Sequence, residues 1–223
     1  MKRLISLIIA LCLLLSFSSC AEERTDIKDY QYMYDGIVKD WNKQAAPDSK
    51  RESILGFGEY LYNSELILFP RETPSTLKEF YYHWTPFMDV DGYAIYFTCE
   101  LDANNYSAFT EGLSNFEVYS DTGSLKPIYD TDHFSLPTYI LQWREVGKKW
   151  EVLEYIMLDE AKRTAVFVYT MSELEFIEEH SSYTVTPSEM HFLDGNFSIY
   201  NYIETDVYFE NCTYDNSFLE YLK

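Results

Sequence analysis

Three consecutive strand-like segments joined by short polar turns constrain the fold of this chain more than any other feature. The segments cover residues 138–146, 149–158 and 163–170, and they are rich in the aromatic and β-branched residues that favour strands. Gly147-Lys148 and the stretch 159–162 supply the turns. Parallel strands need a crossover of about a dozen residues or more, so these connections predict an antiparallel three-stranded meander over about 138–170.

Apolar residues recur at helical spacing in three other places. Residues 26–46 predict an amphipathic N-terminal helix, and its acidic outer face favours packing on a protein core over lying on anionic lipid or binding a partner. Asp102 can cap a second helix, in which Tyr106, Phe109, Leu113 and Phe116 follow at three- and four-residue steps. Ser172 and Glu175 have the spacing of a capping box that opens a short helix.

Strand-like segments outnumber these helices. Besides the meander they are the short run 66–69, residues 80–84 and 93–101, and a terminal hairpin of 196–203 and 206–213. Residues 121–137 are expected to form a long loop. Because the connections are too short for repeated parallel crossovers, the predicted fold class is α+β, with one mostly antiparallel sheet and helices packed on it. Residues 26–223 are expected to form a single domain, with a subdivision near 120–137 as the alternative.

The first twenty residues have the order of a secretory signal. Lys2 and Arg3 precede an apolar stretch from Leu4 to Phe17, and small residues follow. As a helix this stretch would span only about 21 Å, against about 30 Å for the apolar core of a bilayer. We therefore expect residues 1–19 to be a cleaved signal peptide and not a permanent membrane span.

The end of this signal, Phe17-Ser18-Ser19-Cys20, resembles the lipobox of bacterial lipoproteins, in which the final cysteine receives a lipid. Ser18, Ser19 and Cys20 match the pattern, and Phe17 stands where leucine is usual. The resemblance implies that Cys20 carries a diacylglycerol anchor, that residues 20–25 form a tether, and that the protein faces outside the cytoplasm at the cell membrane or outer envelope. Cleavage after Ala21, which would release the protein, is the alternative.

Two cysteines remain after Cys12 leaves with the signal and Cys20 is lipidated. Outside the cytoplasm this pair, Cys99 and Cys212, is able to form a disulfide. However, strand alternation places Cys99 on the apolar face of its strand and Cys212 on a polar one. The pattern therefore favours two separate thiols, with Cys99 buried.

Composition excludes two broad classes. The chain has 17 basic and 37 acidic residues and a formal net charge of −20, which becomes −22 when Lys2 and Arg3 leave with the signal. A chain this acidic repels nucleic acid, so no nucleic-acid partner is expected. The aromatic content of 18% also argues against intrinsic disorder, because disordered chains lack large residues to bury.

No pattern of residues indicates catalysis or metal binding. Asp121-Thr122-Gly123 resembles the loop of aspartic proteases, but that chemistry needs two such loops and the chain has one, so an exposed turn is expected. Asp130, Asp132 and His133 form the densest local cluster of metal-ligand types, without the spacing of a known motif. We therefore expect no catalytic residue, no metal site and no cofactor.

The excess of tyrosine is the remaining clue to function. In the expected terminal hairpin, Tyr200, Tyr202, Tyr208 and Glu210 fall on the outward face and form a candidate binding site, unless a helix or second sheet covers them. The sequence thus predicts a lipid-anchored, non-catalytic binding module for a glycan, peptide or protein partner. The alternatives are an extracytoplasmic hydrolase whose carboxylates converge only in three dimensions, or a structural or assembly accessory.

Overall fold

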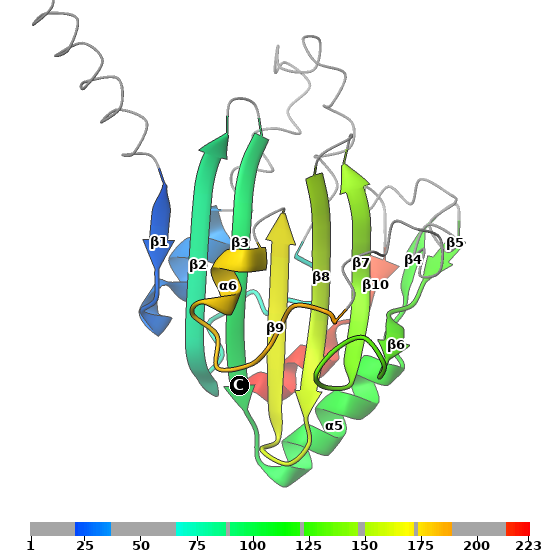
Figure 1. Cartoon of the computed structure of the whole chain (residues 1–223). Helices are drawn as coiled ribbons and strands as arrows, with labels where there is room; N and C mark the ends of the chain where they lie inside the picture. Colours follow the sequence, from blue (N-terminus) through cyan, green and yellow to red (C-terminus); the bar gives the residue numbers. More distant parts are fainter. Residues whose placement is uncertain are drawn as a thin grey trace, which may run out of the picture.

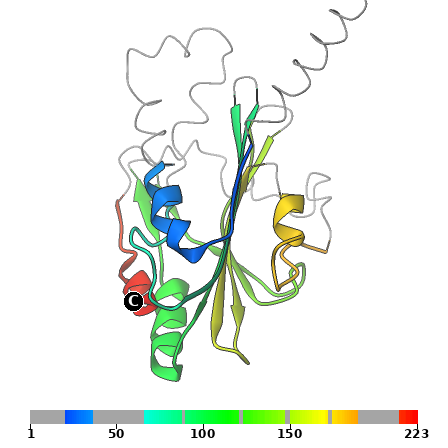
Figure 2. The same cartoon turned by 90° about the vertical axis from the view of Figure 1, so that its left-hand side faces the viewer.

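The computed structural model describes residues 21–36, 66–87, 90–120, 123–146, 150–171, 174–188 and 213–223. Cys20, Cys212 and the expected terminal hairpin with Tyr200, Tyr202, Tyr208 and Glu210 lie outside these residues. In the described part, a large antiparallel sheet carries helices and ordered segments on both faces (Figures 1 and 2).

The large sheet has seven strands, and every neighbouring pair is antiparallel. Its order is β1 (Glu22–Arg24), β2 (Leu77–Phe87), β3 (Val90–Glu100), β9 (Thr164–Met171), β8 (Trp150–Asp159), β7 (Thr138–Val146) and β6 (Ile128–Asp130). A small three-stranded sheet has the order β10 (Thr213–Tyr214), β4 (Val118–Ser120) and β5 (Gly123–Leu125). The described helices are η1 (Ile27–Asp29), residues 30–36, α5 (Ala103–Ser114), α6 (Leu174–Glu178) and η4 (Ser217–Leu222).

The fold is a mixture of short helices with a mostly antiparallel sheet, which is the predicted α+β class. The three segments expected over 138–170 are the strands β7, β8 and β9, and each pairs with the next. Asp102 caps α5 as predicted, because its side chain accepts hydrogen bonds from the backbone N–H groups of Asn104 and Asn105, both at 2.9 Å. Of the expected N-terminal helix, residues 27–36 are described and helical, and its remainder to residue 46 lies outside the described residues.

Three regions differ from their predicted structure. The run 66–69 was expected to be a strand but forms a buried turn, because its four apolar side chains all insert into the core. Residues 121–137 were expected to be a loop but contain β5 and β6, which add short strands to the two sheets. Residues 20–25, expected to act as a tether, contain the edge strand β1, which pairs with β2 from Tyr82 to Trp84.

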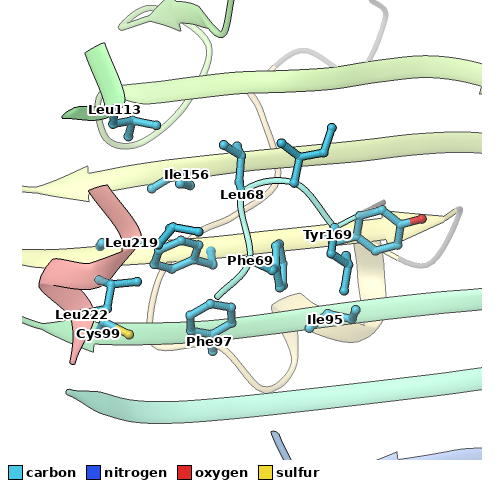
Figure 3. Packing of buried hydrophobic residues seen from close by; sticks show 14 of the residues in the cluster. Leu68, Phe69, Ile95, Phe97, Cys99, Leu113, Ile156, Tyr169, Leu219 and Leu222 are labelled. Atoms are coloured by element: carbon cyan, nitrogen blue, oxygen red, sulfur yellow. The ribbon is translucent and has the colours of Figure 1, made fainter. Parts of the chain in front are cut away.

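The larger apolar core lies between one face of the sheet and a layer made by α5, η4, residues 30–36 and the turn 66–69 (Figures 2 and 3). At its centre Phe97 of β3 stacks on Phe167 of β9, with ring centroids 4.3 Å apart. Cys99 is a free, buried thiol in the same core, as the strand alternation predicted.

A second core covers the opposite face of the sheet. Here Tyr96, Tyr155 and Val168 pack beneath α6 and the segment 181–188, which includes the buried Val185 (Figure 1). Because the central strands are buried on both faces, their sequences are apolar at nearly every position instead of alternating strictly.

Candidate functional site

A groove of about 570 Å³ lies between α5, β4 and η4. About a hundred residues of sequence separate α5 from η4. Figure 1 shows η4 beside α5 on the same face of the sheet. The groove is lined by Ala108, Glu111, Gly112, Asn115, Phe116, Glu117, Tyr119, Asp215, Ser217, Phe218 and Tyr221.

The floor of the groove depends on a close approach between α5 and η4. Phe218 of η4 packs against Phe109 and Phe116, with ring centroids 5.5 Å and 5.4 Å away. Gly112 permits this approach, because a Cβ atom built on it would lie 2.4 Å from the Cβ of Phe218. The glycine inside this helix therefore has a packing role, although glycine lowers helix propensity.

Two tyrosine rings stand at the rim of the groove and are open to solvent. Tyr119 is 54% exposed and Tyr221 is 40% exposed, whereas most large apolar and aromatic side chains of the described residues are buried. Tyrosine combines a flat apolar ring with a polar hydroxyl, and its ring face attracts cations. These rings are suited to contact a ligand lying in the groove.

Three carboxylates, from Glu111, Glu117 and Asp215, share this rim. Hydrogen bonds from Ser124 and Lys126 lower the pKa of Glu117, which also accepts a hydrogen bond from the hydroxyl of Tyr119 at 2.9 Å. Hydrogen bonds from the backbone and side chain of Ser217 lower the pKa of Asp215. Both groups are therefore anions at neutral pH. No lysine, arginine or histidine is among the described residues that line the groove, but Lys126 beside it forms an ion pair with Glu117 at 3.0 Å.

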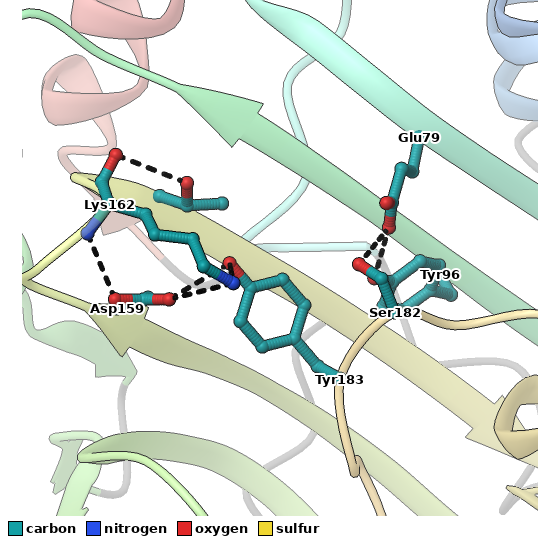
Figure 4. A network of polar contacts seen from close by, with 7 residues as sticks. Glu79, Tyr96, Asp159, Lys162, Ser182 and Tyr183 are labelled. Atoms are coloured by element: carbon teal, nitrogen blue, oxygen red, sulfur yellow. Dashed lines mark hydrogen bonds and ion pairs between the residues drawn. The ribbon is translucent and has the colours of Figure 1, made fainter.

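A polar network on the other side of the sheet holds the segment 181–188 in place (Figure 4). Glu79 accepts hydrogen bonds from the hydroxyls of Tyr96 and Ser182 at 2.6 Å and 2.8 Å. Asp159 accepts one from the hydroxyl of Tyr183 at 3.0 Å and lies 3.5 Å from the Nζ of Lys162. These side chains are bonded to one another and fasten the segment to the sheet, so they form a structural network.

Two further side chains, of Tyr155 and Glu178, hold the same segment. The hydroxyl of Tyr155 donates to the backbone oxygen of Val185 at 2.5 Å, and burial raises the pKa of this phenol well above its ordinary value. Glu178 accepts hydrogen bonds from the backbone N–H groups of Val185, at 2.8 Å, and of Thr186. The segment is thus tied to both the sheet and α6.

The cluster noted in the sequence at residues 130–133 forms a compact turn. Asp130 accepts hydrogen bonds from the backbone N–H groups of Asp132 and His133, and its other oxygen lies 2.8 Å from the Nδ1 of His133. Burial raises the pKa of Asp130, but these hydrogen bonds outweigh it and the net shift is downward. Within the described residues, no group of three or more histidines, cysteines, aspartates or glutamates is arranged to hold a metal ion.

The groove was not predicted from the sequence. The predicted binding residues Tyr200, Tyr202, Tyr208 and Glu210 lie outside the described residues. The pairs Glu117 with Tyr119 and Asp215 with Tyr221 show the same combination of acidic and aromatic residues in the sequence. That they converge on one groove depends on η4 packing against α5, which no local pattern indicates.

Comparisons with known proteins assign neither the fold nor the groove. No family model matches the chain, and no curated protein and no solved structure matches it. None of the helices in the described ranges is both long enough and apolar enough to cross a membrane.

Proposed function

We propose that this chain is a lipid-anchored, non-catalytic binding module of the bacterial cell envelope that holds a lysine- or arginine-bearing segment of a polypeptide in the groove between α5 and η4. The single observation that carries the proposal is the composition of the rim. Three carboxylates and two exposed tyrosine rings meet there, and Lys126, beside the groove, forms an ion pair with the carboxylate of Glu117.

The chemistry of the rim fits a cationic side chain better than a neutral one. A lysine or arginine over the ring of Tyr119 or Tyr221 gains a cation–π attraction, and Glu111 and Asp215 offer charged acceptors for its N–H groups. Long-range attraction to a chain with a net charge of −20 would increase the association rate of such a ligand. A neutral glycan would use the rings but would gain little from three anions.

The state of the carboxylates supports binding over hydrolysis. A carboxylate-based glycosidase needs one carboxyl group whose pKa is raised, so that it donates a proton to the leaving group. In the groove the pKa values of Glu117 and Asp215 are shifted downward by hydrogen bonds, which favours permanent anions. These two groups are acceptors for a ligand and not proton donors.

The anchor belongs to the same proposal. Ser18-Ser19-Cys20 supports lipidation at Cys20, which would hold the domain at the membrane outside the cytoplasm. Because β1 begins at Glu22, only Ala21 separates the lipidated residue from the edge strand. The domain would thus be held close to the membrane with little freedom to move away from it.

The proposal is tested by titrating a hexalysine peptide into the chain from residue 21 onward and measuring its dissociation constant by calorimetry. The double variant Glu111→Gln, Asp215→Asn should weaken binding about tenfold or more, since each lost charged contact costs on the order of 1 kcal/mol. Tyr119→Ser with Tyr221→Ser should also weaken it, because both rings are exposed and their loss does not disturb the core.

The matched control is the double variant Glu160→Gln, Glu179→Gln, which removes the same charge from exposed positions outside the groove. Equal weakening by both double variants would show that the peptide responds only to net charge, and would refute the groove as its site. Binding of a neutral oligosaccharide that the tyrosine variant abolishes, with no binding of hexalysine, would replace the cationic ligand with a glycan.

A further inference from the structure

The small sheet carries a lysine to the edge of the groove. Its strands β4 and β5 are antiparallel neighbours (Figure 1), and Tyr119 is paired with Ser124. Two positions farther from the turn, just beyond the ends of both strands, the same register places Lys126 opposite Glu117. Because side chains alternate between the two faces of a strand, these four residues share one face of the small sheet. Glu117 and Tyr119 line the groove, so this is the face that borders it.

The contacts of Lys126 agree with this register. Its Nζ lies 3.0 Å from Oε2 of Glu117, and the hydroxyl of Tyr119 donates a hydrogen bond to the same oxygen at 2.9 Å. The side chain of Glu117 is 15% exposed, whereas that of Lys126 is 67% exposed. Pro127 follows directly and disfavours a helical backbone at Lys126. The carboxylate is thus held by the small sheet, and the lysine reaches it from the solvent side.

A tyrosine and a carboxylate hold a basic side chain elsewhere in the same molecule. The Nζ of Lys162 lies 4.6 Å from the ring centroid of Tyr183 and 3.5 Å from the carboxylate of Asp159. This combination of a ring and an anion is the one that the rim of the groove offers to a cation. At the rim, Lys126 is the basic side chain of the chain itself that uses part of it.

We propose that Lys126 is a built-in competitor of the cationic ligand, which occupies the carboxylate of Glu117 and must leave before a ligand uses this acceptor. The inference rests on the proposed function, because it concerns the regulation of the same groove. An ion pair this exposed contributes little stability, and the side chain of lysine is long and flexible, so a ligand is able to displace it. While Lys126 stays in place, its charge also repels a ligand cation that enters the groove.

The consequence for the proposed module is a reduced affinity for segments with several basic residues. A first cation finds Glu111 and Asp215 without any change at Lys126. A second cation gains the carboxylate of Glu117 only by giving up the energy of the existing ion pair. Lys126 thus limits how tightly such a segment is held, and its removal should increase the affinity.

The test measures the dissociation constant of hexalysine by calorimetry, for the wild-type chain from residue 21 onward and for its variants. Lys126→Gln should bind about three to five times more tightly, a range set by the strength of an exposed ion pair. Lys126→Arg keeps the cation and should bind no more tightly than the wild type. The matched control is Lys78→Gln. Lys78 is similarly exposed and lies 4.0 Å from Glu100, and no residue of β2 lines the groove. At about 0.15 M salt, which screens distant charges, this control should change the constant less than about twofold.

The outcomes separate this inference from the proposed function. If the wild type binds hexalysine and Lys126→Gln binds it equally or more weakly, the competitor is overturned and the proposed function stands. Equal tightening by Lys126→Gln and Lys78→Gln would also overturn the competitor, because only net charge would then matter. Absence of binding to both the wild type and Lys126→Gln would overturn the proposed function and the inference together. Binding to Lys126→Gln alone would support both, since Lys126 would then block the groove.

Discussion

The carboxylate of Glu154 accepts a hydrogen bond from the backbone N–H of Leu68 at a distance of 2.8 Å, inside the larger core. Glu154 belongs to β8 and is fully buried, whereas Leu68 belongs to the turn 66–69. A buried N–H without an acceptor destabilises a fold, so the hydrogen bond to this carboxylate stabilises the turn where it packs on the sheet. The hydroxyl of Tyr30 donates to the backbone oxygen of Pro70 at 2.7 Å and fixes the end of the same turn.

This relationship predicts different effects for two substitutions of Glu154. Glutamine keeps an oxygen that accepts from Leu68, so Glu154→Gln should retain most of the stability. Glu154→Leu leaves a buried N–H unpaired and should lower the free energy of unfolding by about 1–3 kcal/mol relative to the glutamine variant. Urea denaturation of the chain from residue 21 onward measures both values. Equal free energies for the two variants would show that the hydrogen bond does not stabilise the turn.

Two glycines in helices should respond in opposite ways to alanine. At Gly36 no atom of the described residues outside its own helix lies within 4 Å of an added Cβ, so Gly36→Ala should raise the stability by up to about 1 kcal/mol through helix propensity. At Gly112 the added Cβ would lie 2.4 Å from the Cβ of Phe218, so Gly112→Ala should lower the melting temperature and weaken hexalysine binding. A Gly112→Ala variant that is more stable than the wild type would contradict the close approach of η4 to α5.

The thiol of Cys99 should be inert in the folded protein. Burial raises its pKa to about 12, so almost no thiolate exists at neutral pH. In the chain from residue 21 onward with Cys212→Ser, an aromatic disulfide reagent should react with Cys99 only after denaturant is added. Rapid reaction without denaturant would show that the strand region around Cys99 opens readily.

Acid should weaken the network that holds the segment 181–188. Burial raises the pKa of Asp159, but hydrogen bonds from the backbone of Lys162 and the hydroxyl of Tyr183 outweigh it, so the pKa is lowered from 3.8. A carboxyl whose folded pKa is lowered contributes stability above its unfolded pKa and loses it as the pH falls through the folded value, here below about pH 4. Asp159→Asn should therefore lose less stability than the wild type between pH 5 and pH 3, as urea denaturation at the two pH values would measure.

Glu160→Gln, at the exposed neighbour, is the control and should lose as much stability as the wild type does. If the losses of wild type and Asp159→Asn were also equal, Asp159 would not be the acid-sensitive group.

Sequence patterns predicted the elements that are determined by residues close together in the sequence. The side chain of Asp102 caps α5 as expected, and the strands β7, β8 and β9 pair in chain order. The turn 66–69 was predicted wrongly, because four consecutive apolar residues look the same in a buried strand and in a buried turn. Only the acceptor on Glu154, distant in the sequence, distinguishes the two.

The remaining features depend on contacts between distant segments. The strand β1 has the sequence Glu22-Glu23-Arg24, which carries no strand signal, and it exists because the edge of β2 offers it hydrogen bonds. The groove likewise requires η4 to dock beside Gly112, far away in the sequence. The acidic and aromatic surface predicted at Tyr200, Tyr202, Tyr208 and Glu210 lies outside the described residues and stays a prediction.

The central claim, that the groove between α5 and η4 holds a cationic polypeptide segment, is tested most directly by mapping backbone amide shifts during titration of the ¹⁵N-labelled chain with hexalysine. The account predicts saturable shifts concentrated at residues 108–119 and 215–221, with the largest changes near Tyr119 and Tyr221. Shifts spread evenly over the acidic surface, or concentrated away from these two segments, would contradict it.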